Sequence, residues 1–205
     1  MNTKSHWEKI YSTKKQNELS WTQTSSTLSL ELIQKTGLGP GSKIIDVGGG
    51  TSVLPKNLLE INFSNLTVVD VSAEALSTAK RQLGELGTKV TWLEGDITTI
   101  PLPKTEFDLW HDRAVFHFLT EKEKRSQYVA QAYQSLKPSG FLIIATFALE
   151  GPEKCSGLEV VRYSSASLQS ALGSQFQLRE SRSETHTTPW KTSQEFLYCL
   201  FQKVG

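Results

Sequence analysis

The stretch IIDVGGGTS, residues 44–52, joins a short, mostly apolar run to three consecutive glycines and two small polar residues. A short β-branched run of this kind is typical of a strand that is buried on both faces. Glycines directly after such a strand let the backbone approach a ligand closely, and they direct the N–H groups of the following helix towards it. The stretch therefore predicts a strand, a ligand-binding turn and the beginning of a helix.

Short apolar runs and longer helical patterns alternate through the centre of the chain. Strands are predicted for residues 43–48, 66–71, 90–96, 107–112 and 140–148, and helices for residues 52–61, 72–86 and 121–136. This alternation favours an α/β fold with a mostly parallel sheet, right-handed crossovers and helices on both faces. The segment KPSG, residues 137–140, is expected to end the last of these helices and to turn the chain into a strand.

Both ends of the chain depart from this alternation. Residues 1–36 are predicted to form two helices in front of the sheet. A loop from residue 149 leads to a short helix near residues 165–173 and then to two strand-like runs with only a turn around residues 188–190 between them. Two successive strands without a helix between them form an antiparallel hairpin. We therefore expect a parallel sheet with an antiparallel strand at its C-terminal end.

Composition and charge favour an ordinary globular protein. Charged residues make up 21% of the chain and apolar residues 38%, which excludes a disordered chain. A formal net charge of +1 gives no electrostatic reason to expect nucleic acid or an anionic membrane as a partner. Since neither a signal peptide nor a membrane-spanning run is recognisable, we expect a cytoplasmic protein, and a monomer by default. Cys155 and Cys199 lie far apart and predict no metal site and no disulfide framework.

The spacing within the glycine loop separates two kinds of ligand. The dinucleotide fingerprint requires Gly-x-Gly-x-x-Gly, but Gly48, Gly49 and Gly50 are followed by Thr51, Ser52 and Val53. Asp46 stands two residues ahead of the first glycine, where a carboxylate would repel a pyrophosphate and attract an ammonium group. The loop therefore disfavours a nicotinamide-dependent oxidoreductase, which is kept as an alternative, and favours a ligand with a positive charge.

Four motifs follow one another in a fixed order. They are DVGGGTS at 46–52, VVDVS at 68–72, EGDI at 94–97, and FDLWHDRAVFHF at 107–118 with LKPSGFLIIATF at 136–147. As an ordered set they resemble the class I S-adenosylmethionine-dependent methyltransferases over nearly the whole chain. The resemblance implies a Rossmann-like, seven-stranded, mostly parallel sheet with an antiparallel last strand, and S-adenosyl-L-methionine as the cofactor. It divides a single domain, residues 1–205, into a helical lid segment (1–36), a cofactor-binding core (43–148) and an acceptor-side part (149–205).

The resemblance also assigns cofactor contacts to the ends of two strands. Asp70, followed by Val71, ends the second strand about 20 residues after the glycines, where a carboxylate accepts the ribose hydroxyls; the alternative is a charge at the N-terminus of the next helix. Gly95 and Asp96 end the third strand. Asp96 is expected to accept from the adenine amino group, and Ile97 to offer its backbone N–H to the ring; a turn aspartate is the alternative.

Aromatic residues gather near the N-terminus. His6, Trp7, Ile10 and Tyr11 fall on helical spacing, which also suits an amphipathic face that packs on the domain. Together with Trp21 they are interpreted as a lid over the cofactor, because aromatic faces attract a sulfonium cation when water is excluded. The packing and lid interpretations are compatible.

The segment FDLWHDRAVFHFLT, residues 107–120, places ionisable residues inside an apolar run. His111 and Asp112 are expected to face the methionine part of the cofactor. Arg113 is expected to pair with Asp112 or to reach the cofactor carboxylate. His117 and His111 are the candidate catalytic bases, because the pKa of histidine suits proton transfer; Asp112 and His186 are further candidates.

The methyl acceptor is the least defined part of the sequence-based hypothesis. Similarity in size and in the N-terminal aromatic pattern to the citrate-synthase-lysine methyltransferases and some bacterial relatives suggests a protein lysine, or a small-molecule amine, thiol or hydroxyl. In-line methyl transfer needs positioning rather than a metal. Arg162, Tyr163, His186 and Trp190 lie in segments that approach the expected acceptor side, whereas Cys155 suits a surface thiol and Cys199 the core. A non-catalytic S-adenosylmethionine-binding module is a further alternative.

Overall fold

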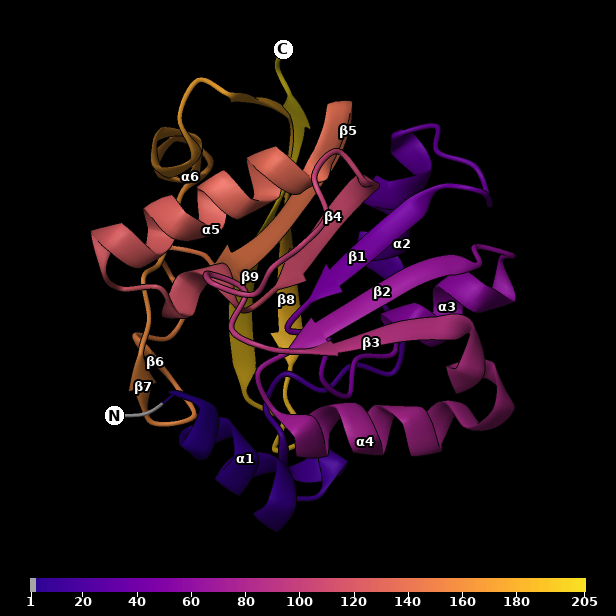
Figure 1. The fold of residues 1–205 in the computed structure, drawn as a ribbon. Coiled ribbons are helices and arrows are strands. Elements are labelled where there is room, and N and C mark those ends of the chain that lie inside the picture. Colours follow the sequence, from indigo (N-terminus) through magenta and orange to yellow (C-terminus); the bar gives the residue numbers. More distant parts are fainter. Residues whose placement is uncertain (1–2) are drawn as a thin grey trace.

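A computed structural model describes residues 3–205 of the chain (Figure 1). The helices are α1 (Thr3–Thr13), α2 (Thr27–Lys35), α3 (Leu54–Glu60), α4 (Ala73–Leu83), α5 (Lys122–Ser135) and α6 (Ser165–Leu172). The strands are β1 (Lys43–Val47), β2 (Asn65–Asp70), β3 (Val90–Glu94), β4 (Phe107–Arg113), β5 (Leu136–Phe147), β6 (Lys154–Cys155), β7 (Leu158–Glu159), β8 (Phe176–Thr187) and β9 (Ser193–Lys203). Short 3₁₀ turns occupy Gln16–Glu18, Gly84–Lys89 and Phe116–Phe118.

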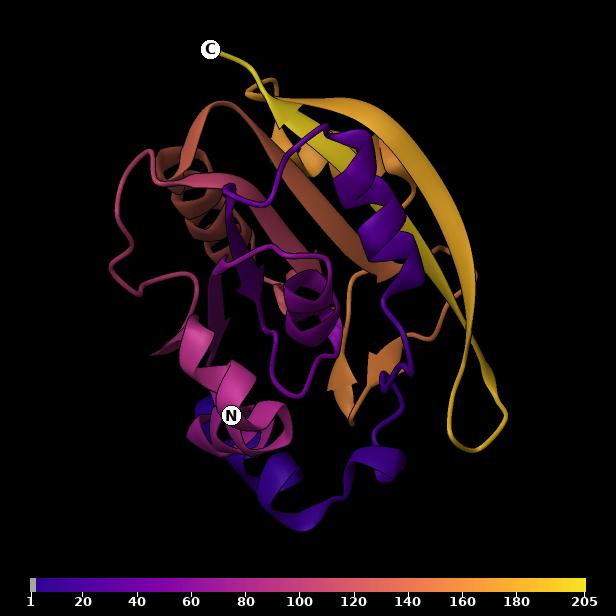
Figure 2. The same cartoon turned by 90° about the vertical axis from the view of Figure 1, so that its right-hand side faces the viewer.

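Seven strands form one sheet in the order β3-β2-β1-β4-β5-β9-β8. The pairs from β3 to β5 are parallel, whereas β9 runs antiparallel to both β5 and β8. The predicted α/β class, the mostly parallel sheet and the antiparallel last strand are confirmed. Figure 2 shows the long β8–β9 hairpin along one border of the molecule. Strands β6 and β7 form a separate small hairpin.

Two apolar clusters cover the two faces of the sheet. Side chains alternate along a strand, so Ile45 of β1 packs with α5 and α6 while its neighbour Ile44 packs with α2 and α3. Figure 1 shows α5 in front of the sheet and α2 and α3 towards its other face. Because β1 is buried on both sides, its sequence is a nearly continuous apolar run.

Two features of the chain differ from the predicted boundaries. β5 begins at Leu136, so the predicted turn at 137–140 is an irregular start of this strand, with Ser139 at φ 59°. The pairing between β4 and β5 is irregular there, because Phe107 pairs with Leu136 but Leu109 pairs with Phe141. The β6–β7 hairpin was not predicted, although Ser156 and Gly157, both with positive φ, form the kind of two-residue turn that joins hairpin strands.

Helix α1 lies across the end of the sheet beside α4, far from the C-terminus (Figures 1 and 2). The Glu8 carboxylate accepts from the backbone N–H of Ala73 at 2.7 Å and from the Ser72 hydroxyl at 3.1 Å, which places it on the N-terminus of α4. A negative charge is stabilised there by the exposed N–H groups and the helix dipole. Lys4 of α1 forms an ion pair with Glu94 at the end of β3. These contacts attach α1 to the ends of β2 and β3.

No helix between residues 3 and 205 combines the length and the apolar character that crossing a bilayer requires.

Candidate functional site

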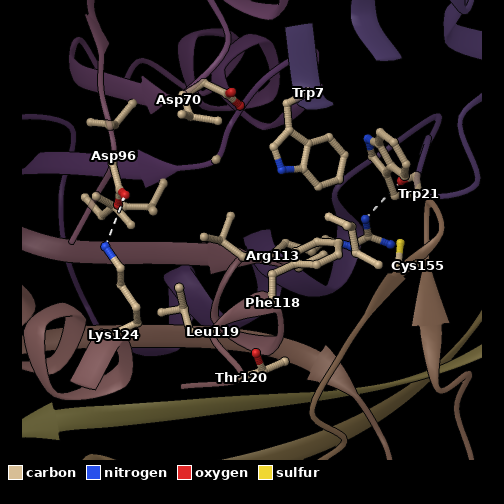
Figure 3. A pocket seen from close by; sticks show the side chains of 18 of the residues that line it. Trp7, Trp21, Asp70, Asp96, Arg113, Phe118, Leu119, Thr120, Lys124 and Cys155 are labelled. Carbon is tan, nitrogen blue, oxygen red and sulfur yellow. Dashed lines mark hydrogen bonds and ion pairs between the residues drawn. The ribbon is translucent and has the colours of Figure 1, made fainter. Parts of the chain in front are cut away.

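A cavity of about 370 Å³ opens at the C-terminal ends of β1, β2, β3 and β4, beneath α1. Ligands of open α/β sheets bind at this edge, where the strand order reverses on either side of β1 and β4. Figure 3 shows Asp70 and Asp96 on one side of the cavity and Trp7, Trp21 and Cys155 on the other. We call these the nucleoside side and the aromatic end. The aromatic end comprises Trp7, Trp21, Phe118, Cys155 and Leu158.

Asp70 ends β2 on the nucleoside side and is only 6% exposed. One carboxylate oxygen accepts from the Ser72 N–H at 2.9 Å, and the Gly50 N–H also donates to the carboxylate. Burial raises the pKa of Asp70 to about 7 against these stabilising bonds, and the nearby carboxylates of Asp46 and Glu8 add to the increase. Asp70 therefore titrates near neutral pH and is poised to accept hydroxyl donors.

Gly95, Asp96 and Ile97 follow β3 and line the same cavity. One oxygen of Asp96 accepts from the backbone N–H and the hydroxyl of Thr98, at 2.9 and 2.7 Å, and the other lies 3.6 Å from the Lys124 ammonium. Burial opposes ionisation, but the Thr98 bonds and Lys124 outweigh it and lower the pKa of Asp96. The turn-capping interpretation of Asp96 thus holds alongside its place in the cavity wall.

The glycine loop leaves no room for side chains. A Cβ on Gly48, which has φ +63°, would lie 2.0 Å from Val115 Cγ2. A Cβ on Gly50, at φ +41°, would lie 2.7 Å from Tyr11 Oη and 3.1 Å from an Asp70 carboxylate oxygen. The left-handed backbone and the close neighbours both require glycine. The loop backbone therefore borders the ligand space directly.

A second, smaller cavity adjoins the first and shares Gly48, Tyr11, Trp21 and Arg113 with it. Asp46 also lines it, and its buried Oδ2 has no hydrogen-bond partner among residues 3–205. The same is true of Arg113 Nη2, whose ion-pair partner Glu184 is 3.9 Å away. Buried charged atoms without a hydrogen bond are costly, so a carboxylate and a guanidinium that line one cavity favour a ligand of complementary charge. The α-ammonium and α-carboxylate of an amino acid fit this pair.

His111 and Asp112 do not face the ligand space as expected. His111 lies buried between Asp46 Oδ1 at 2.7 Å and Ser29 Oγ at 2.9 Å. It therefore touches neither cavity and acts by orienting Asp46. Asp112 points to the opposite face of the sheet, where it accepts from the Tyr128 hydroxyl at 2.6 Å and from the N–H of Val115 at 2.9 Å.

Arg113 does not form the expected pair with Asp112. Its Nε donates to the Tyr198 hydroxyl at 2.7 Å and its Nη1 to the carbonyl of Trp21 at 2.9 Å. The guanidinium also lies over the Phe196 ring, 4.5 Å from its centre. Arg113 is therefore held from the β8–β9 hairpin and reaches the ligand space with its remaining nitrogen.

His117, the main candidate base, lies outside the cavity wall formed by the described residues. Its Nδ1 accepts from the Phe147 N–H at 3.3 Å, and its ring packs against Phe118 and Phe147. Burial, with the Arg113 charge, lowers the pKa of His117 to about 3. His186 Nε2 donates to the carbonyl of Ser20 at 2.7 Å, and His186 is likewise absent from the wall. The geometry gives neither histidine access to a ligand.

The remaining acceptor-side candidates separate into three groups. Cys155 is 5% exposed and lines the cavity, so its expected surface position is wrong. Tyr163 and Cys199 belong to the core. Arg162 binds the carbonyl of Leu149 and the Glu153 carboxylate, and Trp190 is 57% exposed.

The aromatic interpretation of the N-terminal segment agrees with the cavity. The Trp7 ring lies edge-on to Trp21 at 5.7 Å and to Phe118 at 5.1 Å between ring centres. Leu158 of the unpredicted β6–β7 hairpin and Lys124 of α5 were missed as wall residues. The Ser156-Gly157 turn is a signal for the first, whereas nothing in the sequence around Lys124 marks the second.

Comparisons with known proteins agree with this geometry. Residues 44–140 match a family model described as "Methyltransferase domain". The ubiquinone/menaquinone biosynthesis C-methyltransferase UbiE of Psychromonas ingrahamii is 27% identical over 55% of this chain and 45% of that protein. EEF1A lysine methyltransferase 2 of Homo sapiens is 24% identical over 71% of this chain and 68% of that protein. The chain spans about half the length of several curated relatives that it matches.

Solved structures show the same fold. A structure described as "Conversion of a Disulfide Bond into a Thioacetal Group during Echinomycin Biosynthesis" superposes with a TM-score of 0.80 at 12% identity, covering 99% of this chain and 92% of that chain. A SAM-dependent methyltransferase from Methanosarcina mazei gives 0.70 at 16% identity, covering 84% and 97%. The fold, the cavity and the match over residues 44–140 agree with a class I methyltransferase domain. The cofactor of that class is S-adenosylmethionine.

The residues present fit this cofactor. Its nucleoside needs a carboxylate for the ribose, which Asp70 offers, and its amino-acid part needs opposite charges, for which Asp46 Oδ2 and Arg113 Nη2 are without a hydrogen-bond partner among the described residues. The glycine loop lies between these two regions and lets a ligand pass close to the backbone. Within residues 3–205, no group of three or more His, Cys, Asp or Glu side chains is arranged to hold a metal ion.

The pKa of Asp70 predicts how nucleoside binding depends on pH. Ribose hydroxyls donate to the ionised carboxylate, so protonation of Asp70 below about pH 7 must weaken binding, by up to about tenfold per pH unit. Calorimetry with methylthioadenosine, which lacks the amino-acid part and its titrating amine, measures this. Asp70→Asn should bind about 1–3 kcal/mol more weakly with no such pH dependence. An equally steep dependence in Asp70→Asn would remove Asp70 from this role.

The unpaired Asp46 oxygen predicts a selective loss. Asp46→Asn should weaken S-adenosylmethionine binding by about 1.5–3 kcal/mol, because a bond to a charged group is lost. Methylthioadenosine has no ammonium group and should bind the variant as it binds the wild type. Asp108→Asn is the matched control, since Asp108 pairs with Lys137 at the other end of β4. Equal losses for both ligands would show that the substitution damages the loop rather than an ammonium site.

The position of His117 predicts that it takes no part in proton transfer. Asn offers an oxygen near the place of Nδ1 and keeps the bond from the Phe147 N–H. His117→Asn, once shown to be folded by its thermal transition, should therefore keep the wild-type pH profile of methyl transfer between about pH 6 and pH 9. If the acidic or the basic limb of that profile disappeared in the variant, the hypothesis that His117 acts as a base would be supported again.

Proposed function

We propose that this protein transfers the methyl group of S-adenosylmethionine to a small-molecule acceptor held at the aromatic end of the cavity, by in-line displacement. The observation that carries this proposal is the continuity of the cavity. One space runs from Asp70 and Asp96 to the rings of Trp7, Trp21 and Phe118. A donor held at the nucleoside side thus meets an enclosed site for a second molecule.

The size of the cavity supports a small acceptor. Small-molecule sites commonly measure roughly 300 to 1,000 Å³, and this cavity, at about 370 Å³, lies near the lower limit. Most of it is taken by the cofactor if Asp70 holds the ribose. The room that is left then suits a small ligand or a single thin side chain.

The residues of the chain bind, orient and exclude water. Asp70 and Asp96 hold the nucleoside, Asp46 and Arg113 hold the amino-acid part, and His111 keeps Asp46 in place. Trp7 and Phe118 cover the space where the reacting groups meet, so that water is excluded and the approach is restricted. The bound cofactor supplies an activated methyl group on a sulfonium sulfur.

A protein lysine is the second candidate acceptor. The support is the match to EEF1A lysine methyltransferase 2, which extends over 71% of this chain. A lysine side chain is thin enough to enter the cavity, and aromatic faces attract its ammonium group. Cytoplasmic location, a monomeric state and the division into lid, core and acceptor-side parts stay predictions.

A transfer assay with a tritium-labelled methyl donor and fractionated bacterial lysate tests the proposal. Label should enter the small-molecule fraction, and Gly50→Ala should reduce it by about tenfold or more, because a Cβ there meets Asp70 and Tyr11. Gly39→Ala is the matched control, since a Cβ on Gly39 meets nothing within 4 Å. Label found only in the protein fraction would contradict a small-molecule acceptor and favour a protein lysine. Binding without any transfer would indicate a non-catalytic module, and binding of NAD alone would indicate an oxidoreductase.

A further inference from the structure

The aromatic end offers no group that takes a proton near neutral pH. Among the described residues that form it, only Cys155 ionises, and burial raises its pKa to about 11. The neighbouring Tyr11 hydroxyl has its pKa raised further, by burial and then by Asp70. The guanidinium of Arg113 carries hydrogen-bond donors and no acceptor. His6, His111, His117 and His186 lie outside the wall, although the His6 ring stands edge-on to Trp7 at 5.3 Å between ring centres and its buried Nε2 has no hydrogen-bond partner among the described residues.

The carboxylates of the cavity are placed for other purposes. Asp70 and Asp96 lie on the nucleoside side, and Asp96 is bound by Thr98 and Lys124. Glu159 has its side chain 68% exposed and pairs with Lys154 at 2.9 Å, and Glu121 is also exposed. A solvated carboxylate is too weak a base to take the proton of an amine or a hydroxyl efficiently.

An acceptor at this end must therefore arrive as a nucleophile. The three acceptor types differ sharply in this respect. A thiol has a pKa of about 8.5 and is a few per cent thiolate at pH 7, whereas an alkyl amine has a pKa of about 10.4 and an alcohol is scarcely ionised. The thiolate is also the most nucleophilic of the three. The missing base is thus no obstacle for a thiol.

The side chains around the aromatic end also favour a thiol as the acceptor. Trp7, Trp21, Phe118 and Leu158 make a weakly polar wall, in which opposite charges attract more strongly than in water. A thiolate and a sulfonium cation annihilate their charges on reaction, so a weakly polar site promotes their reaction. A neutral amine gains no such advantage, because its product keeps a positive charge.

We propose that the acceptor is a small thiol that binds at the aromatic end as its thiolate; this inference rests on the proposed methyltransferase function. The thiol loses its proton to water before or as it binds. Its sulfur then forms a bond to the methyl carbon as the bond from that carbon to the sulfonium sulfur breaks. The electron pair of the broken bond stays on the cofactor sulfur. The products are a methyl thioether and S-adenosylhomocysteine, both without the original sulfur charges.

The test uses matched acceptors with the purified full-length protein. Thiophenol, phenol and aniline form one set, and benzyl mercaptan, benzyl alcohol and benzylamine form another, with 2-mercaptoethanol as a third thiol. We expect at least about tenfold higher kcat/KM for a thiol than for its oxygen and nitrogen counterparts, the size expected from a thiolate advantage of this kind. Cys155→Ala is run in parallel, so that label on the protein's own thiol is not counted as turnover.

The pH profile separates an ionised acceptor from an enzymatic base. For a thiolate acceptor, kcat/KM rises with pH up to the pKa of the thiol itself, so the inflection for thiophenol lies below that for benzyl mercaptan. An inflection that stays fixed across the thiols would show an enzymatic base and overturn the inference. A binding measurement is independent of turnover: with S-adenosylhomocysteine bound, each thiol should quench the fluorescence of Trp7 and Trp21 more strongly as pH rises, and its alcohol counterpart should show no such change. A pH-independent thiol response would contradict thiolate binding.

The outcomes also distinguish this inference from the function on which it rests. Faster methylation of an amine or hydroxyl than of its matched thiol overturns the thiol inference and leaves methyl transfer to a small acceptor intact. If none of the three thiols is methylated while lysate small molecules are, the thiol inference again fails alone. If no small molecule of either kind is methylated, both proposals fail.

Discussion

Asp46 lies near the C-terminal end of β1 with one carboxylate oxygen bound to His111 and the other without a hydrogen-bond partner among the described residues. Burying a carboxylate with one oxygen unbonded costs free energy, and removing the bond to His111 would raise that cost further. His111 in turn binds Ser29 of α2, so a buried polar chain runs from β1 through β4 to α2. The glycine loop, the second cavity and the expected ammonium site all depend on where these hydrogen bonds hold Asp46.

The fold could be predicted from the sequence because its signals are local. Continuous apolar runs marked β1, β2 and β4, and glycines in a strained turn marked the ligand edge. The places of Asp70 and Asp96 in the cavity wall followed from the same logic, since Asp70 ends β2 and Asp96 follows the end of β3. The β6–β7 hairpin escaped because each of its strands has two residues, too few to show a period.

The side chains after Trp110 could not be placed in this way. Successive residues of a strand point to opposite faces, so His111 reaches Ser29 of α2 while Asp112 reaches Tyr128 of α5. A run of ionisable residues at the end of β4 therefore cannot face one ligand together. The period of two was available from the sequence; the missing information was which helix would supply a partner on each face. The same applies to His117, whose ring is enclosed by Phe118 and Phe147.

The distribution of charge within the ligand space has a simple physical consequence. The described buried atoms without a hydrogen-bond partner include one carboxylate oxygen and one guanidinium nitrogen, and both belong to the second cavity. The aromatic end has no comparable unpaired charge. A zwitterionic amino-acid group would compensate these two atoms of Asp46 and Arg113. Local rules of burial are thus broken where a charged ligand could compensate them, which is how a binding site differs from a defect in the core.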